Sequence, residues 1–158
     1  RRYSSAASDV YKRQVIGWTI ATGTITIEPI ILFLIIFVWT PSHFWALSLY
    51  KSGDYKKAKI PMLPVIAGTK TTKTNILVYS FAMLPVVIAP YYFEFASLLY
   101  LVTALVMTIY YNYLCLELFK AKVTKTSNKI ARKVFIYSIF YLFFIYLILL
   151  IDNARSLF

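Results

Sequence analysis

Long apolar runs, separated by short polar or basic segments, constrain this chain more than any other feature of its sequence. Leu, Ile, Val and Phe crowd into stretches with almost no charge, and 60% of the 158 residues are hydrophobic. A bilayer core of about 30 Å is crossed by some 20 apolar residues of α-helix. Runs of this length therefore indicate membrane-spanning helices rather than a water-soluble domain. We expect an all-α, polytopic transmembrane helical bundle.

Four of these runs are long enough to span a membrane, and a fifth is too short. The short run, residues 15–23, has nine residues and is expected to be the remnant of a helix. Residues 1–14 before it are polar, have no apolar periodicity and are excluded from the fold as a non-native tail. We expect the last helix to be capped by Ser127 or Asn128. The spanning helices are predicted at about residues 28–50, 74–90, 96–118 and 130–151, within one membrane domain that covers residues 15–158.

The basic residues alternate along the chain in the way that cytoplasmic loops do. The formal net charge is +11, and of the 17 Lys and Arg residues six lie in residues 51–73 and six in residues 120–133. The connections at residues 24–28 and 91–95 carry no Lys or Arg. The positive-inside rule then places both basic segments in the cytoplasm and the chain end after Asp152 outside. The charge thus indicates topology, and we expect no nucleic-acid partner.

The lone cysteine, Cys115, lies in an apolar run. One cysteine supports neither a disulfide framework nor a metal site. We expect a small buried hydrophobic side chain.

The chain's one histidine lies on a polar and aromatic stripe of the first spanning helix. Trp39, His43, Leu47 and Tyr50 are spaced by three and four residues, which places them on one helix face pointing toward the segment that bears Asp54. A polar side chain inside a membrane is costly unless it faces a cavity or the bundle interior, so His43 is a functional candidate. The alternative is a histidine that bonds to a neighbouring helix for packing. The sequence leaves both open.

Asp54 is the one acid between Glu28 and Glu94, and lysines surround it. Basic segments bind anionic lipid headgroups without needing an acid, so the carboxylate has its own explanation. Either it balances charge on a solvated surface, or it helps to hold a Mg²⁺ ion that bridges phosphate oxygens. In the second case Lys56 and Lys57 would contact the phosphate as point charges.

Cations also lie near the starts of the second and fourth predicted helices. Helix N-termini attract anions, so cations there indicate that an anion lies between them and the helix end. That anion is either the phosphate of membrane lipid or the diphosphate of a substrate. The residues concerned are Lys70, Lys73, Arg132 and Lys133.

Two segments carry a resemblance to a known family. Residues 39–69, WTPSHFWALSLYKSGDYKKAKIPMLPVIAGT, resemble the signature region of the heme O synthases, which belong to the UbiA-type superfamily of intramembrane prenyltransferases. That family's pattern is close to WTPPHFWALAL followed by DYxxAGVPMLPV. Residues 131–141, ARKVFIYSIFY, resemble the start of the family's last helix. The resemblance runs from residue 15 to about residue 152.

The resemblance implies a nine-helix bundle that transfers a farnesyl group from farnesyl diphosphate to the vinyl group of protoheme IX. The products are heme O and diphosphate, with Mg²⁺ steadying the departing diphosphate. Taken with the residues above, it predicts catalytic roles for Asp54 and Tyr55, with Asp54 as the metal ligand. Diphosphate binding is predicted for Lys56, Lys57, Lys70, Arg132 and Lys133, and a substrate or heme pocket for Trp39, His43, Phe44, Tyr50 and Met62.

The chain also departs from the family pattern. Ser42 stands in place of the usual second proline, Gly53 in place of an often acidic residue, and Lys59 in place of the usual glycine. The family's first aspartate-rich motif, NDxxD, does not occur in the sequence. We therefore expect the chain to be a C-terminal part, inactive alone, of an enzyme whose N-terminal half carries that motif. A bacterial inner membrane is expected, because the signature follows the bacterial form of the pattern.

Two other functions stay open from the sequence. A UbiA-type prenyltransferase acting on a quinone precursor is one, although such enzymes generally have more aspartates in this motif. A non-catalytic membrane subunit or half-transporter is the other, with Pro41 and His43 lining a path.

Overall fold

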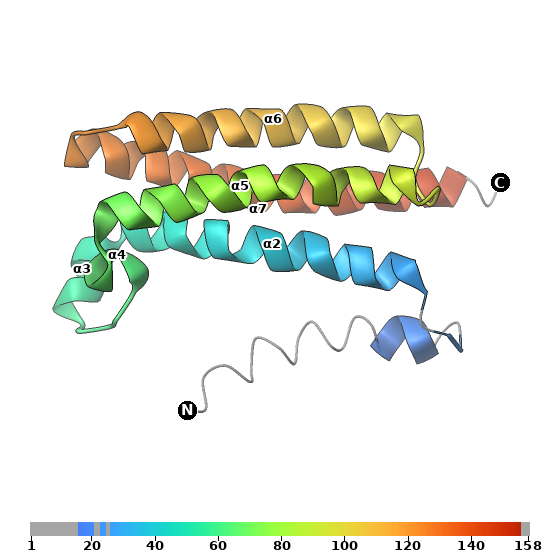
Figure 1. The fold of residues 1–158 in the computed structure, drawn as a ribbon, viewed down its shortest axis with the longest axis horizontal. Coiled ribbons are helices and arrows are strands. Elements are labelled where there is room, and N and C mark those ends of the chain that lie inside the picture. Colours follow the sequence, from blue (N-terminus) through green and yellow to red (C-terminus); the bar gives the residue numbers. More distant parts are fainter. Residues whose placement is uncertain (1–15, 21–22, 25, 156–158) are drawn as a thin grey trace.

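The structure, a computed structural model, describes residues 16–20, 23–24 and 26–155, and helices make up almost all of this part of the chain (Figure 1). A short helical segment at residues 16–20 comes first, where the sequence predicts a helix remnant at residues 15–23. Residues 15, 21 and 22 of that prediction, and the tail at 1–14, lie outside the described residues. The helices that follow are α2 (Ile27–Tyr50), α3 (Ser52–Lys57), α4 (Leu63–Ile66), α5 (Gly68–Tyr92), α6 (Leu98–Lys120) and α7 (Thr124–Arg155).

The four long helices form a closed, antiparallel bundle (Figure 1). Helix α2 packs against α5 and α7, and α6 packs against the same two helices, so that α2 and α6 lie diagonally across the bundle. The short helices α3 and α4 lie at the end where α2 ends and α5 begins, and the α6–α7 connection lies at the same end (Figure 1). Both basic segments of the sequence therefore meet there, and we call it the basic end.

All four long helices have the length and hydropathy of membrane spans. Their outward surfaces are apolar: in α7, for example, Phe143 is 61% and Leu150 69% exposed. Such surface is stable in lipid and would be costly in water. The predicted all-α membrane bundle is confirmed, and the predicted bounds of α2 and α6 are right to within two residues.

The predicted starts of α5 and α7 are wrong. Helix α5 begins at Gly68 rather than at residue 74, and α7 begins at Thr124 rather than at residue 130. Ser127 and Asn128 therefore lie inside α7 and do not cap it. The first turns of α7 have a buried helix face that is difficult to recognise in the sequence because lysines lie between its members. The buried residues, spaced by three and four, are Ser127, Ile130, Ala131 and Val134.

The interior combines apolar packing with hydrogen bonds between helices. Cys115 is buried in α6, as predicted, within an apolar cluster that includes Leu49, Ile76 and Val134. Hydroxyl groups join the helices because a polar atom left unpaired in a membrane interior costs several kcal/mol. The bonds are Tyr111 Oη to Ser42 Oγ, Thr108 Oγ1 with Tyr141 Oη, Tyr137 Oη to the Met107 carbonyl and Tyr146 Oη to the Leu32 carbonyl.

Candidate functional site

His43 lies in an aromatic slot between α2 and α7. Its imidazole stacks on Trp39, with ring centroids 4.3 Å apart, and on Phe135 of α7, with centroids 4.7 Å apart. Two rings cannot occupy one face of an imidazole, so Trp39 and Phe135 enclose it from opposite sides. Nδ1 of His43 lies 2.7 Å from Oγ of Ser138, also on α7. The ring is thus held in one orientation.

The walls of the slot are tied to α7 as well. The indole Nε1 of Trp39 donates a hydrogen bond to the Ser138 carbonyl at 2.9 Å, and the Ser138 hydroxyl donates to the Phe135 carbonyl at 2.7 Å. Phe44, another predicted pocket residue, meets the His43 ring edge-on with 5.5 Å between centroids and is exposed. Three of the predicted pocket residues, Trp39, His43 and Phe44, therefore come together.

An apolar groove of about 670 Å³ begins at Trp39 and runs between α2 and α7 away from the basic end. Its walls are aliphatic and aromatic, and Tyr146 is the one lining residue with a hydroxyl group. A hydrocarbon chain is the kind of ligand that such a groove takes. The lining residues are Ile36, Trp39, Ile139, Leu142, Phe143, Tyr146, Leu147 and Leu150.

A second group of predicted residues gathers around Tyr50 at the basic end. The Lys51 ammonium lies 5.3 Å and the Arg132 guanidinium 5.8 Å from the centre of the Tyr50 ring, in cation–π geometry. Lys51 Nζ also lies 3.2 Å from the Asp54 carboxylate. The hydrogen bond to Asp54 and its negative charge raise the pKa of Lys51 above its ordinary value. Arg132 and Asp54, far apart in the sequence, are thus joined through Tyr50 and Lys51.

Asp54 itself is open to ligands. Its side chain is 69% exposed and, within the described residues, Lys51 is its one ion-pair partner. Lys56 and Lys57 follow it on α3 and are exposed, while Tyr55 is half-buried. Met62 is half-buried in the extended stretch before α4. The predicted stripe reaches the Asp54 segment at its Tyr50 end, through Lys51. His43 itself faces α7, and no contact within the described residues joins it to Asp54.

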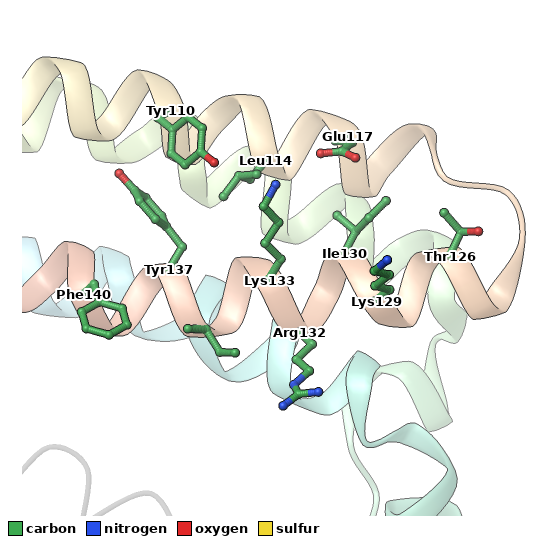
Figure 2. A pocket seen from close by; sticks show the side chains of 11 residues that line it. Tyr110, Leu114, Glu117, Thr126, Lys129, Ile130, Arg132, Lys133, Tyr137 and Phe140 are labelled. Carbon is green, nitrogen blue, oxygen red and sulfur yellow. The ribbon is translucent and has the colours of Figure 1, made fainter.

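Within the described residues, Lys70, Lys73 and Lys133 form no ion pair with Asp54 and no cation–π contact with Tyr50. Lys133 points from α7 toward Glu117 and Leu114 of α6, whereas Arg132 points away from α6, and both line a groove of about 700 Å³ (Figure 2). Lys70 lines a different pocket, between the start of α5 and the end of α6. Lys73 is buried, and its ammonium donates to the Ala121 carbonyl at 2.7 Å. It satisfies the carbonyl group of Ala121, the residue that follows the last turn of α6, which explains the position of Lys73 without an anion.

Comparison with known proteins decides the family. The model of the UbiA prenyltransferase family matches residues 14–151. The chain belongs to the UbiA prenyltransferase family. It is 64% identical over 139 residues to a protoheme IX farnesyltransferase of Pelagibacter ubique, which covers 88% of the chain and 46% of that relative. It is 43% identical over 143 residues to a protein of the same name from Parvibaculum lavamentivorans, covering 90% of the chain and 45% of the relative.

A protoheme IX farnesyltransferase of Rickettsia massiliae is 44% identical over 142 residues, covering 90% of the chain and 46% of that relative. The chain therefore spans a little under half the length of the curated relatives it matches. No solved structure matches the chain.

Ser42 and Lys59, two of the departures from the family pattern, differ in how well they fit their positions. Ser42, which stands where this UbiA-family signature usually has proline, is fully buried, donates to the Trp39 carbonyl at 2.9 Å and accepts from Tyr111. Lys59, which stands where glycine is usual, has φ +53°. That left-handed conformation is natural for glycine and strained for lysine.

A UbiA-family diphosphate site would hold Mg²⁺, and the described residues fit part of such a site. Among them, no group of three or more His, Cys, Asp or Glu side chains comes together. Mg²⁺ typically takes only one or two carboxylates and fills its remaining positions with water and phosphate oxygens. Asp54, exposed and paired with Lys51, could supply one such carboxylate.

Sequence reasoning missed the α7 side of the His43 slot. Phe135 and Ser138 lie in the segment that resembles the family's last helix, but an apolar run with one serine gives no sign of a partner 95 residues away. Which side chains of α2 and α7 meet depends on how the two helices pack against each other in the bundle. The spacing of Ser138 and Tyr141 with Ala131 and Val134, on one face of α7, was the available signal.

Proposed function

We propose that this chain forms part of a farnesyltransferase that moves a farnesyl group from farnesyl diphosphate to the terminal carbon of a vinyl group of protoheme IX. A water molecule adds its hydroxyl to the neighbouring vinyl carbon and releases a proton, so the products are heme O and diphosphate. The names and identities of its relatives support the reaction. Since the chain spans under half of their length, the activity belongs to the whole protein. We expect the remaining part of the enzyme to precede this segment and to carry the first aspartate-rich motif.

Among this chain's own residues, one observation supports the proposal: the apolar groove and the cations of the basic end lie along the same α2–α7 edge. Trp39 heads the groove, and Tyr50 holds the cations Lys51 and Arg132 at the basic end. Eleven residues of helix separate Trp39 from Tyr50, which is about 16 Å at 1.5 Å per residue. A prenyl diphosphate, with an anionic head and a hydrocarbon chain, matches this division.

The charged end must stabilise the negative charge that develops on the departing diphosphate. When the bond from the farnesyl C1 carbon to the diphosphate oxygen breaks, its electron pair goes to the oxygen and negative charge grows there. Groups fixed in advance around that oxygen stabilise the transition state more than the bound substrate. In the proposal Lys56, Lys57 and Arg132 neutralise the diphosphate, and Asp54 holds a Mg²⁺ ion, which would neutralise part of the same charge when bound. Lys70, Lys133 and Tyr55 stay predictions from the sequence.

The location follows from the same arrangement. We propose a multi-pass protein of the bacterial inner membrane with the basic end in the cytoplasm, where the positive-inside rule places it. Membrane lipid then surrounds the apolar faces of the long helices.

Two alternative functions differ from this proposal in the prenyl acceptor: one has another acceptor, and the other has no acceptor. A UbiA-family enzyme acting on a quinone precursor would share the charged end, whereas a half-transporter would transfer no prenyl group. The relatives' shared name favours heme as the acceptor.

The test is a chimera in which this chain's matching residues replace those of the Pelagibacter ubique relative. Purified in lipid nanodiscs with Mg²⁺ and farnesyl diphosphate, the chimera should convert heme to heme O and leave a hydroxybenzoate unchanged, as followed by chromatography and mass spectrometry. Prenylation of the hydroxybenzoate would support the quinone-precursor function instead. Absence of any prenyl transfer, with the parent relative active in parallel, would contradict the proposal.

A further inference from the structure

The hydrogen atoms around Ser138 fix the tautomer of His43. Ser138 Oγ lies 2.7 Å from the Phe135 carbonyl oxygen and 2.7 Å from His43 Nδ1. A carbonyl oxygen carries no hydrogen, so the first contact uses the single hydrogen of the serine hydroxyl. The second contact therefore needs a hydrogen on Nδ1. In the neutral imidazole Nε2 is then the atom with the free lone pair.

That lone pair is unused by the described residues. Nε2 has no hydrogen-bond partner among them, and it is not among the enclosed polar atoms that lack a partner, so it keeps some exposure on the surface of the bundle. The ring cannot turn to hide it, because Trp39 and Phe135 hold both faces and Ser138 holds Nδ1. The slot thus presents one nitrogen lone pair in a fixed direction.

The geometry points to His43 as a ligand, through Nε2, of the iron in the heme substrate, with Ser138 as the positioning residue that holds the required tautomer. This inference rests on the proposed function, in which heme is the acceptor. Neutral imidazole is the commonest metal ligand in proteins, and a ligating histidine almost always donates its other N–H to an oxygen acceptor. The Ser138 hydroxyl is that acceptor here.

A single histidine is enough for this ligand. Porphyrin supplies four nitrogens to its iron, so the protein needs no cluster of acidic or cysteine side chains, and none occurs among the described residues. The surroundings also suit a flat apolar body: Trp39 and Phe44 flank the ring, and the apolar groove begins at Trp39. The packing function of His43 that the sequence left open requires the Nδ1 bond but assigns nothing to Nε2.

The experiment titrates the purified 158-residue chain in lipid nanodiscs with ferric heme and, in parallel, with iron-free protoporphyrin IX. The wild-type chain should give the absorption and Raman bands of nitrogen-ligated iron. His43→Ala should lose those bands while binding protoporphyrin as the wild type does. Ser138→Ala should weaken heme binding at least about 10-fold, the usual effect of removing a hydrogen-bond partner of a ligating histidine.

Two controls separate ligation from folding. Ser48→Ala removes another buried serine hydroxyl, whose one hydrogen bond to a described residue goes to the Trp45 carbonyl on its own helix, and it should leave heme binding unchanged. His43→Gly opens space between Trp39 and Phe135, and added imidazole should restore the nitrogen-ligated spectrum. Rescue would also prove that the variant is folded.

Three results would overturn the inference. These are an unchanged spectrum in His43→Ala, equal effects of Ser138→Ala and Ser48→Ala, and a wild-type chain that binds no heme. None of them decides the transfer reaction, which the chimera assay measures separately through heme O formation. Conversely, a chimera that prenylates only a hydroxybenzoate would contradict the proposed function even if His43 ligates iron.

Discussion

The phenol of Tyr111 on α6 donates a hydrogen bond of 2.9 Å to the hydroxyl of Ser42 on α2, across the diagonal of the bundle. Both side chains are fully buried, and Ser42 passes the bond on to the Trp39 carbonyl. At the position where the family pattern has proline, this chain therefore has a hydroxyl group that joins two helices lying diagonally across the bundle. The bond lies beside Trp39 and so supports the wall of the His43 slot.

Removing this bond should destabilise the bundle modestly. Tyr111→Phe leaves the Ser42 hydroxyl without its donor, and Ser42→Ala leaves the Tyr111 phenol without its acceptor, so each should cost about 1 kcal/mol. In the double variant neither partner is stranded, and the loss should be smaller than the sum of the single losses. Thermal unfolding in detergent measures this. Tyr113→Phe, an exposed tyrosine on the same helix, should have no effect, and additive losses would mean that the bond contributes nothing.

The strain at Lys59 predicts a stabilising substitution. Its φ of +53° costs a side-chain-bearing residue roughly 1 kcal/mol that glycine does not lose, partly offset by the greater freedom of glycine in the unfolded chain. Lys59→Gly should therefore unfold at a higher temperature than Lys59→Ala, which keeps the strain but removes the same charge. Equal unfolding temperatures for the two variants would show that the turn is not strained.

The orientation can be read with single cysteines in a Cys115→Ala background. Ala58 and Thr126 are exposed at the basic end and Ala154 is exposed at the other, whereas the buried Ser127 would react poorly on either side. In intact cells an impermeant thiol reagent should label Ala154→Cys and spare Ala58→Cys and Thr126→Cys. All three should react once the cells are opened. Labelling of Ala58→Cys from outside would reverse the orientation.

This chain alone should make no heme O. In the proposal the departure of diphosphate needs the carboxylates of the first aspartate-rich motif as well as Asp54, and that motif does not occur in this sequence. Purified chain given farnesyl diphosphate, Mg²⁺ and heme should therefore be inactive under conditions in which the chimera is active. Product from the chain alone would show that these residues form a complete catalytic site.

Apolar run length was enough to predict the membrane class, the four spans and the position of Cys115. Helix starts at the basic end were predicted too late because lysines interrupt an apolar pattern, although α5 and α7 continue through them with Thr72, Lys73, Ser127 and Ile130 buried. In those turns polar residues occupy some of the buried positions, so a hydropathy pattern does not identify the turns as part of a buried helix face.

For the candidate site, the sequence identified the residues near the signature but not their partners. Trp39 and His43 could be grouped by helical spacing, which is a local property, and Phe44 by the resemblance to the family signature. Phe135 and Ser138 could not, because their approach depends on the closure of α7 against α2. The same limit applies to Arg132 and Lys133, neighbours in sequence that both line the groove between α6 and α7 (Figure 2), although Arg132 also reaches the Tyr50 ring on α2.

The charge at Asp54 is the most direct test of the proposed reaction. In the chimera, Asp54→Asn keeps the shape of the side chain and removes the carboxylate that would hold Mg²⁺ near the departing diphosphate. Loss of one such preorganised group should lower turnover by about 10² to 10³ and shift its Mg²⁺ dependence to higher concentration. Glu94→Gln, an exposed acid at the opposite end of the bundle, should change neither. The measurement is heme O formation against Mg²⁺ concentration for the unaltered chimera and both variants, and an Asp54→Asn curve that coincides with the unaltered one would contradict the account.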